Sequence, residues 1–163
     1  MSYKDVISLE NADGTTELTP LQQMCVVAFI DECTASHQYL MAAHLARGNG
    51  YVDATDEYKQ HLEEEREHAD KWLKRLEQMG IKVKLDLSQI QDSGNKWTPI
   101  TTSNIKEQLE IIIKAEHDAV EFYSKIVDAA REAKDWITNR LAKQLMEDET
   151  THEFDLLRIY EGL

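Results

Sequence analysis

Residues 58–76 read YKQHLEEEREHADKWLKRL, and apolar side chains recur in this stretch every three or four residues. The apolar positions are Tyr58, Leu62, Ala69, Trp72, Leu73 and Leu76. This period predicts an α-helix with one face turned toward a core. Glu65 and His68 stand on the same face, at positions where the period calls for apolar residues. The stretch therefore predicts a helix that directs a carboxylate and an imidazole into the protein interior.

Three other segments show the same interruption of an apolar stripe by ionisable side chains. The interrupting residues are Glu32, Glu116, Glu149 and His152. With Glu65, this places one carboxylate on the core face of each of four predicted helices. A buried carboxylate without a partner costs several kcal/mol, so the four together predict that a cation lies among them.

The four helices are expected over about residues 20–47, 53–79, 103–133 and 135–160, with Thr19, Pro20 and Gln22 forming a helix start and Gly80 a helix stop. Short connections make each consecutive pair an antiparallel hairpin, whereas residues 81–102 are long enough to cross the length of a bundle. We predict one all-α domain over residues 1–163, with an N-terminal extension over residues 1–18. Its architecture is a ferritin-like four-helix bundle, two antiparallel helical hairpins joined by one long crossover.

The two predicted hairpins repeat the same pattern of ionisable residues. The interval from Glu32 to Glu65 equals the interval from Glu116 to Glu149, and one constant shift along the chain maps the first hairpin onto the second. The matched pairs are Glu32 with Glu116, Tyr39 with Tyr123, Glu65 with Glu149, and His68 with His152. At a rise of about 1.5 Å per residue, the four carboxylates meet near the middle of the bundle.

Four carboxylates and two imidazoles are ligands typical of iron or manganese rather than of Cu(I) or a thiolate zinc site. Their four negative charges balance two divalent ions. Glu and His three residues apart lie on the same side of a helix, so one turn presents both. The symmetric assignment places Glu32 and His68 on one metal ion, Glu116 and His152 on the other, and Glu65 and Glu149 between them.

The composition excludes several other classes of function. With 18 basic and 31 acidic residues, the net charge is −13, which disfavours binding to nucleic acid or to an anionic membrane. No apolar run approaches the length of a membrane span, and the segment from Met1 to Pro20 does not resemble a secretory signal. Two cysteines suit a reducing compartment. We therefore expect a cytoplasmic protein.

At these residues the sequence resembles the bacterioferritin and mini-ferritin-like branch of the ferritin-like superfamily, over about residues 19–161. Residues 31–39, DECTASHQY, are similar to that branch's D-E-x-T-A-x-x-Q-Y segment. Residues 65–70, EREHAD, look like its E-x-x-H-A-D, and residues 147–152, EDETTH, contain its D-E-x-x-H. The resemblance implies that the six carboxylate and imidazole residues form an intrasubunit di-iron ferroxidase centre, with Tyr39 beside it as a residue that can supply an electron.

The resemblance also implies a reaction, a cofactor and an assembly. The expected function is oxidation of Fe(II) to Fe(III) with O₂ or H₂O₂, followed by iron storage and detoxification in a homo-oligomeric cage. Two iron ions per subunit are expected, with manganese or zinc as substitutes. Bacterioferritins place a haem-ligating Met directly after the second-helix Glu, and Arg66 stands there in this chain, so no haem is expected. Rubrerythrins need another Glu at the position of Ala119. The size of the cage, at 12, 24 or fewer subunits, stays open.

Two alternatives also stay open at this point. The same site could belong to a non-storage di-iron or di-manganese enzyme, such as a peroxidase, catalase or oxidase, or to a structural bundle that only holds metal. The remaining histidines, His37, His44, His61 and His117, are expected at the surface or rim, and Glu63, Glu64 and Glu67 on a solvated face. Cys25 and Cys33 are expected as core filler. A second apolar strip on the first helix predicts a subunit interface and consists of Val26, Val27, Ile30, Met41 and Leu45.

Overall fold

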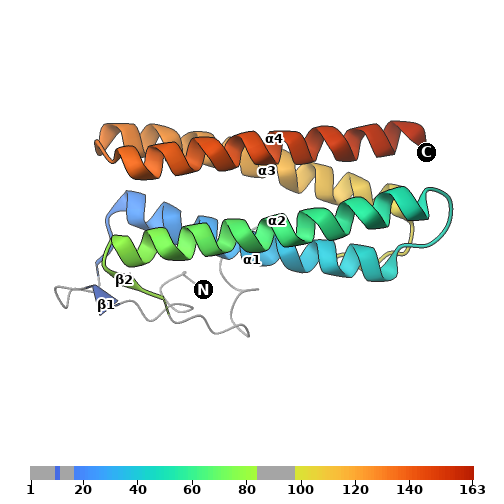
Figure 1. The fold of residues 1–163 in the computed structure, drawn as a ribbon, viewed down its shortest axis with the longest axis horizontal. Coiled ribbons are helices and arrows are strands. Elements are labelled where there is room, and N and C mark those ends of the chain that lie inside the picture. The colour runs from blue at the N-terminus through green and yellow to red at the C-terminus, as the bar shows by residue number, and fades with distance from the viewer. Residues whose placement is uncertain (1–9, 12–16, 84–97) are drawn as a thin grey trace.

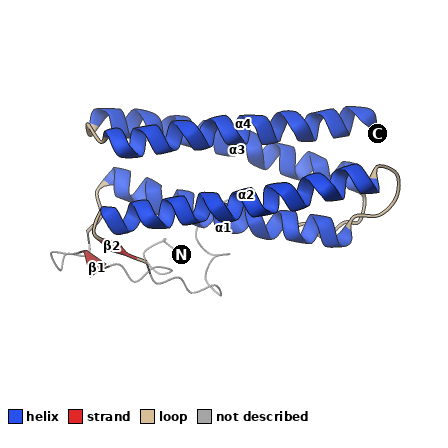
Figure 2. Ribbon diagram, viewed as in Figure 1, coloured by secondary structure: helices blue, strands red, loops and turns tan. Residues whose placement is uncertain are grey.

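The computed structural model describes residues 10–11, 17–83 and 98–163. Most of the predicted N-terminal extension, 1–18, and of the predicted crossover, 81–102, lies outside these residues. The elements are β1 (Glu10–Asn11), α1 (Pro20–Leu45), α2 (Tyr51–Gln78), β2 (Ile81–Lys82), α3 (Ile105–Glu132) and α4 (Trp136–Gly162). The predicted all-α four-helix bundle is confirmed (Figure 1, Figure 2). Within the described ranges, no helix is long and apolar enough to cross a membrane.

The ends of the helices follow from local hydrogen bonding. Thr19 and Gln22 form a reciprocal capping box, and the side chain of Asn104 accepts from two backbone N–H groups at the start of α3. Asp135 accepts from the backbone of Thr138 at the start of α4. Gly80 has a φ of 77°, a left-handed conformation that glycine adopts without steric cost, and it follows the end of α2.

The two hairpins are α1 with α2 and α3 with α4, packed against each other through α1 on α3 and α2 on α4. Figure 1 shows that α3 begins at the end of the bundle where α2 also begins. There Arg47, just after α1, donates its backbone N–H to the carbonyl of Ser103 at 3.0 Å. The end of α2 and the start of α3 therefore lie at opposite ends of the bundle.

The apolar core consists of two clusters separated by the middle of the bundle. One cluster includes Phe29, Leu76, Ile126 and Leu145, and the other includes Ala42, Leu62, Ile112 and Leu156. The helix turns between these sets carry the buried ionisable residues. The apolar clusters therefore hold the four helices in register on either side of a polar middle layer.

Two features differ from the sequence prediction. Strands β1 and β2 pair antiparallel, and both are too short to produce an alternating pattern in the sequence. In the predicted interface strip, Val26 and Ile30 are buried within the chain, in the same cluster as Leu18 and Ile81, so these two residues are not available for a subunit contact. The other members, Val27, Met41 and Leu45, are partly exposed, and the interface stays a prediction. The large apolar side chains that remain exposed are Leu40, Tyr51, Val52, Trp136, Ile137, Phe154, Leu157 and Leu163.

Candidate metal centre

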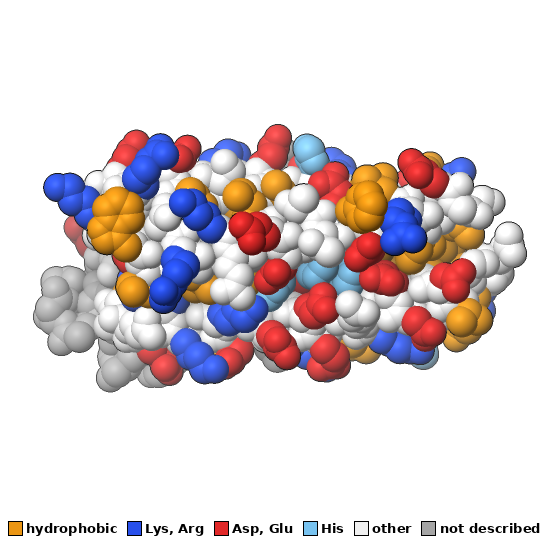
Figure 3. Space-filling view, turned by 45° about the horizontal axis from the view of Figure 1, so that its top comes forward, with side chains coloured by type: hydrophobic (Ala, Val, Ile, Leu, Met, Phe, Trp, Pro, Cys, Tyr) orange, Lys and Arg blue, Asp and Glu red, His pale blue; other side chains and the backbone are white. Residues whose placement is uncertain are grey.

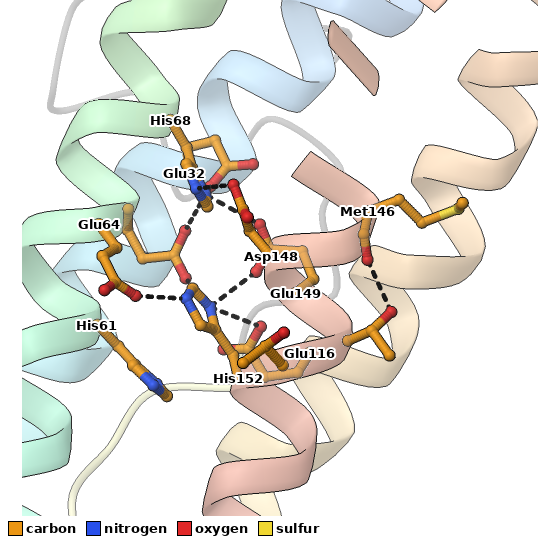
Figure 4. Close-up of polar contacts among 12 residues, drawn as sticks. Glu32, His61, Glu64, His68, Glu116, Met146, Asp148, Glu149 and His152 are labelled. Atoms are coloured by element: carbon orange, nitrogen blue, oxygen red, sulfur yellow. Dashed lines mark hydrogen bonds and ion pairs between the residues drawn. The ribbon is translucent and has the colours of Figure 1, made fainter. Parts of the chain in front are cut away.

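Six ionisable side chains meet in the polar middle layer, and each is at most 4% exposed. They come from all four helices: Glu32 from α1, Glu65 and His68 from α2, Glu116 from α3, and Glu149 and His152 from α4. These are the six residues that the sequence predicts as metal ligands. Figure 4 labels five of them, and their side chains converge between the helices: Glu32, His68, Glu116, Glu149 and His152.

The first group surrounds the Nδ1 atom of His68. This nitrogen lies 3.0 Å from Glu149 Oε1, 3.3 Å from Glu65 Oε2 and 3.6 Å from Glu32 Oε2. One potential ligand atom from each of the four residues lies within 4.8 Å of every other. The group therefore gathers three carboxylates and one imidazole at a single position.

The second group surrounds the Nδ1 atom of His152 in the same way. This nitrogen lies 3.1 Å from Glu149 Oε2, 3.2 Å from Glu65 Oε1 and 3.8 Å from Glu116 Oε2. Glu65 and Glu149 belong to both groups and offer a different oxygen atom to each. The two adjacent groups thus contain the residues that the symmetric assignment gives to each metal ion, with Glu65 and Glu149 common to both. The role of each residue as a ligand stays a prediction.

Unsatisfied polar atoms test whether metal ions fit these positions. Among the described residues, both carboxylate oxygens of Glu65, Oε1 of Glu149 and Nδ1 of His68 are buried without a hydrogen-bond partner. Leaving such an atom unsatisfied costs about 1–3 kcal/mol, and more when it is charged. Oxygen and imidazole nitrogen are the donors that iron, manganese and zinc accept. The donor set therefore fits divalent metal ions, which would satisfy all four atoms.

Electrostatics in the metal-free cluster favour bound protons. Burial, reinforced by the charges of Glu65 and Glu149, raises the pKa of Glu32 well above its ordinary value. Burial also raises the pKa of Glu116. For His68, burial alone would lower the pKa, but the surrounding carboxylates of Glu149, Glu32 and Glu65 outweigh burial and raise the pKa to about 12. A metal ion entering the cluster must therefore displace protons.

Two buried tyrosines contact the cluster in a crossed arrangement. The hydroxyl of Tyr39 on α1 donates to Oε1 of Glu116 on α3, and that of Tyr123 on α3 donates to Oε1 of Glu32 on α1. Each hydroxyl thereby fixes one carboxylate of the other hairpin. Tyr39 lies beside the cluster as the sequence predicts, and Tyr123 repeats its position.

The side chains behind the two tyrosines break this symmetry. Nδ1 of His61 lies 3.0 Å from the Tyr39 hydroxyl, whereas the indole N–H of Trp72 donates to the Tyr123 hydroxyl at 2.8 Å. Groups that hydrogen-bond to a ligand change its basicity and so its metal affinity. We therefore expect the Glu32/His68 and Glu116/His152 positions to bind metal with unequal affinity.

Anaerobic Fe(II) titration, followed by crystallography at less than one ion per subunit, tests this expectation. The Trp72→Phe variant removes the indole donor and should change occupancy mainly at the position that contains Glu32. Equal occupancy of both positions throughout the titration would contradict the inequality and leave the paired site intact.

Two residues near the cluster correct the sequence prediction. His61 is 1% exposed, so its expected place at the surface or rim is wrong. Glu64 is half-buried rather than fully solvated, and its Oε2 lies 2.7 Å from Nε2 of His152. Asp148 occupies the equivalent place in the second hairpin, with Oδ2 3.3 Å from Nε2 of His68. A carboxylate of the other hairpin thus orients each histidine. Because Glu64 and Asp148 occupy matched positions in the two repeated hairpins, the sequence repeat could have revealed this pairing.

A cavity of about 550 Å³ opens onto the cluster from the side of α1 and α3. Its lining includes all four cluster carboxylates, together with Ala115, Ala119 and Phe122 of α3 and exposed Lys114 and Lys125. Asp31 also lines it, and burial raises the pKa of this carboxyl to about 8. Because exposed residues form part of the lining, the cavity connects the cluster with the surface.

A bundle of two hairpins with a buried carboxylate and histidine cluster at its centre has the construction of the ferritin-like class. The ferritin-like domain model matches residues 29–162 of this chain. The chain therefore belongs to the ferritin-like family.

Three related proteins are similar to this chain. A Methanocaldococcus jannaschii protein, named as a candidate rubrerythrin, is 34% identical over 117 residues; the match covers 70% of this chain but only 56% of that protein's length. The Bacteroides fragilis bacterioferritin-related protein, described as a dodecameric thioferritin, has a TM-score of 0.84 at 25% identity, over 92% of this chain and 89% of that one. A mycobacterial bacterioferritin shares the fold with a TM-score of 0.73 at 20% identity, over 91% and 89% of the two chains.

Proposed function

We propose that this protein is a ferroxidase that binds two Fe(II) ions per subunit, oxidises them to Fe(III) with O₂ or H₂O₂, and stores the product. The observation that carries the proposal is the pair of buried groups that share two carboxylates and contain unsatisfied donor atoms. The proposed ligands are Glu32, Glu65, His68, Glu116, Glu149 and His152.

The reaction assigns a task to each part of the site. Two Fe(II) ions release two electrons, which together with two protons reduce either one O₂ to H₂O₂ or one H₂O₂ to two waters. Glu65 and Glu149 would hold the two ions next to each other. The cavity between α1 and α3 would admit Fe(II) and the oxidant. Tyr39, whose hydroxyl donates a hydrogen bond to Glu116, would supply a further electron to the oxidant.

The proposed assembly is a homo-oligomeric shell that encloses the oxidised iron. The dodecameric state of the Bacteroides fragilis relative supports this proposal. Exposed apolar residues such as Trp136, Ile137 and Phe154 supply surface for subunit contacts. Arg66, the residue in the haem-ligand position, pairs with Glu63 at 2.6 Å on the surface, and the absence of haem stays a prediction.

Solution mass combined with aerobic Fe(II) addition tests the proposal. A large shell that retains many iron ions per subunit supports ferroxidation with storage. A small oligomer that retains two ions supports the second candidate function, a non-storage di-iron or di-manganese peroxidase, catalase or oxidase. The candidate rubrerythrin among the relatives favours keeping that alternative. A protein that binds no metal would contradict both.

Filling the cavity is expected to slow the loading of the site. In the Ala119→Phe variant the new ring would occupy the lining beside the carboxylates, so Fe(II) oxidation should slow several-fold. Metal stoichiometry after long anaerobic incubation should stay at the wild-type value, because no ligand changes. Stopped-flow absorbance measures the rate, with Ala119→Ser as the matched control. An unchanged rate in Ala119→Phe would show that Fe(II) and oxidant enter elsewhere.

A further inference from the structure

A third group of ligand-type side chains lies beside the candidate metal centre, between α2 and α4. It contains Glu57 and His61 of α2 and Asp155 of α4, with one potential ligand atom from each within 4.8 Å of the others. His61 Nε2 lies 3.1 Å from Glu57 Oε1. The imidazole is buried, whereas the carboxylates of Glu57 and Asp155 are 25% and 32% exposed. The group therefore joins a buried nitrogen to two carboxylates that solvent can reach.

The hydrogen bonds of His61 determine what its Nε2 atom can do. Tyr39 has a single hydroxyl proton, which it donates to Glu116. The tautomer that carries its proton on Nδ1 uses that proton in the 3.0 Å contact with the Tyr39 hydroxyl, which leaves Nε2 with a free lone pair. A histidine that donates from one ring nitrogen presents the other as a ligand.

Nε2 then faces the carboxylate of Glu57 at a distance where two lone pairs would repel each other. In that tautomer a proton or a metal ion would lie between Nε2 and the Glu57 carboxyl group. The second carboxylate, Asp155, adds negative charge at the same point. Its neighbouring cation, Arg158, stays 3.9 Å away with a side chain that is 71% exposed, so it is free to move aside.

We infer that Glu57, His61 and Asp155 form a third divalent-cation site, separate from the two positions of the candidate centre. One imidazole nitrogen and two carboxylate oxygens are a donor set for Fe(II), Mn²⁺ or Zn²⁺. The site adjoins the centre through ring contact, since the His61 ring stacks on His152 with centroids 4.0 Å apart. It shares no ligand with the centre.

The position of the third site suggests its role, and this part of the inference rests on the proposed ferroxidase function. Figure 3 shows histidine side chains among acidic ones near the middle of one face of the molecule. Half-exposed Glu64 forms a further group with His61 and His152, so ligand atoms continue from the third site toward the centre. A cation at the third site would thus be Fe(II) that enters from the α2/α4 face, by a second route in addition to the α1/α3 cavity.

Isothermal titration of the metal-free full-length protein with Zn²⁺, a redox-inert probe, tests the site. Wild-type protein is expected to bind three ions per subunit, and the double variant Glu57→Gln/Asp155→Asn is expected to bind two. The matched control is Glu67→Gln/Glu161→Gln, which removes two exposed carboxylates from the same two helices and should keep three. In Zn²⁺-soaked crystals, an anomalous peak is expected about 2.0–2.1 Å from His61 Nε2.

Each outcome decides the inference. Three ions bound to the double variant, or no anomalous peak at His61, would overturn the third site. A proton alone would then lie between His61 Nε2 and Glu57. Two ions bound to wild-type protein with rapid Fe(II) oxidation would overturn the third site alone. No bound ions in wild-type protein would overturn the candidate centre as well.

Discussion

Fe(II) oxidation is expected to slow by at least about 100-fold when Glu116 is replaced by Gln. Changing a residue that only supports a metal ligand typically costs 10–100-fold, so loss of a charged ligand should cost at least the upper end of that range. Gln has nearly the same volume and can still accept the hydrogen bond from Tyr39, so the bundle should persist. Stopped-flow absorbance of Fe(III) formation at neutral pH measures the effect.

The matched control is Glu132→Gln, which changes an exposed carboxylate near the end of the same helix and should leave the rate unchanged. Without metal, Glu116→Gln should be at least as stable as the wild-type protein, because it removes one of four clustered carboxylates. The equivalent change in the other hairpin, Glu32→Gln, should slow oxidation similarly. Wild-type kinetics in both variants would contradict the ligand assignment.

The helices and their order could be predicted because local signals agreed with the long-range pattern. The capping box at Thr19, the left-handed Gly80 and the cap at Asn104 mark helix ends within a few residues. The internal repeat of the two hairpins added a tertiary constraint, because the matched carboxylates had to lie at the same height along the bundle axis. The register of the two hairpins follows from that constraint.

The second apolar strip of α1 predicts burial on more than one side, but what covers that side could not be predicted from its period. Val26 and Ile30 have the pattern of a surface strip, but a cluster with Leu18 and Ile81 covers them. Those two residues belong to irregular or very short elements outside the helices, whose packing leaves no periodic signal.

The six predicted ligands could be found because each violates an apolar stripe, whereas polar residues at the edge of a stripe were misjudged. His61, Glu65, His68 and Trp72 follow one another at spacings of four, three and four, which places His61 on the inward face of α2. Glu64 lies one position off that face, and only the position of His152 on α4 makes it a partner. Contacts between hairpins of this kind depend on helix rotation, which the sequence does not specify.

Stability of the metal-free protein is expected to fall as pH rises from 6.0 to 7.5. Glu32, Glu116, His68 and His152 all have a pKa raised in the folded state, the carboxyls by burial and the histidines by surrounding carboxylates that outweigh burial. A raised pKa gives stability that is present below the unfolded value and is lost as pH rises toward the folded value. Glu65 has a lowered pKa, so its stability is lost only in acid.

Each group that holds a proton in the folded state but not in the unfolded state reduces stability by about 1.4 kcal/mol per pH unit. His68 and His152 both act in this direction, and His61, whose pKa burial lowers to about 4, opposes them as a single group, so the melting temperature in EDTA should fall by at least about 2 °C between the two pH values. Bound Mn²⁺ replaces these protons, and its affinity rises with pH. Stabilisation by Mn²⁺ should therefore be larger at pH 7.5 than at pH 6.0.

Thermal unfolding followed by circular dichroism, in EDTA and in excess Mn²⁺ under argon, measures all four conditions. Glu116→Gln, which lacks one of the proton-binding groups, should show a shallower decline in EDTA than Glu132→Gln. A metal-free protein that becomes more stable toward pH 7.5 would show that the cluster is ionised without metal. An equal Mn²⁺ effect at both pH values would show that the metal binds without displacing protons, and therefore outside the buried cluster.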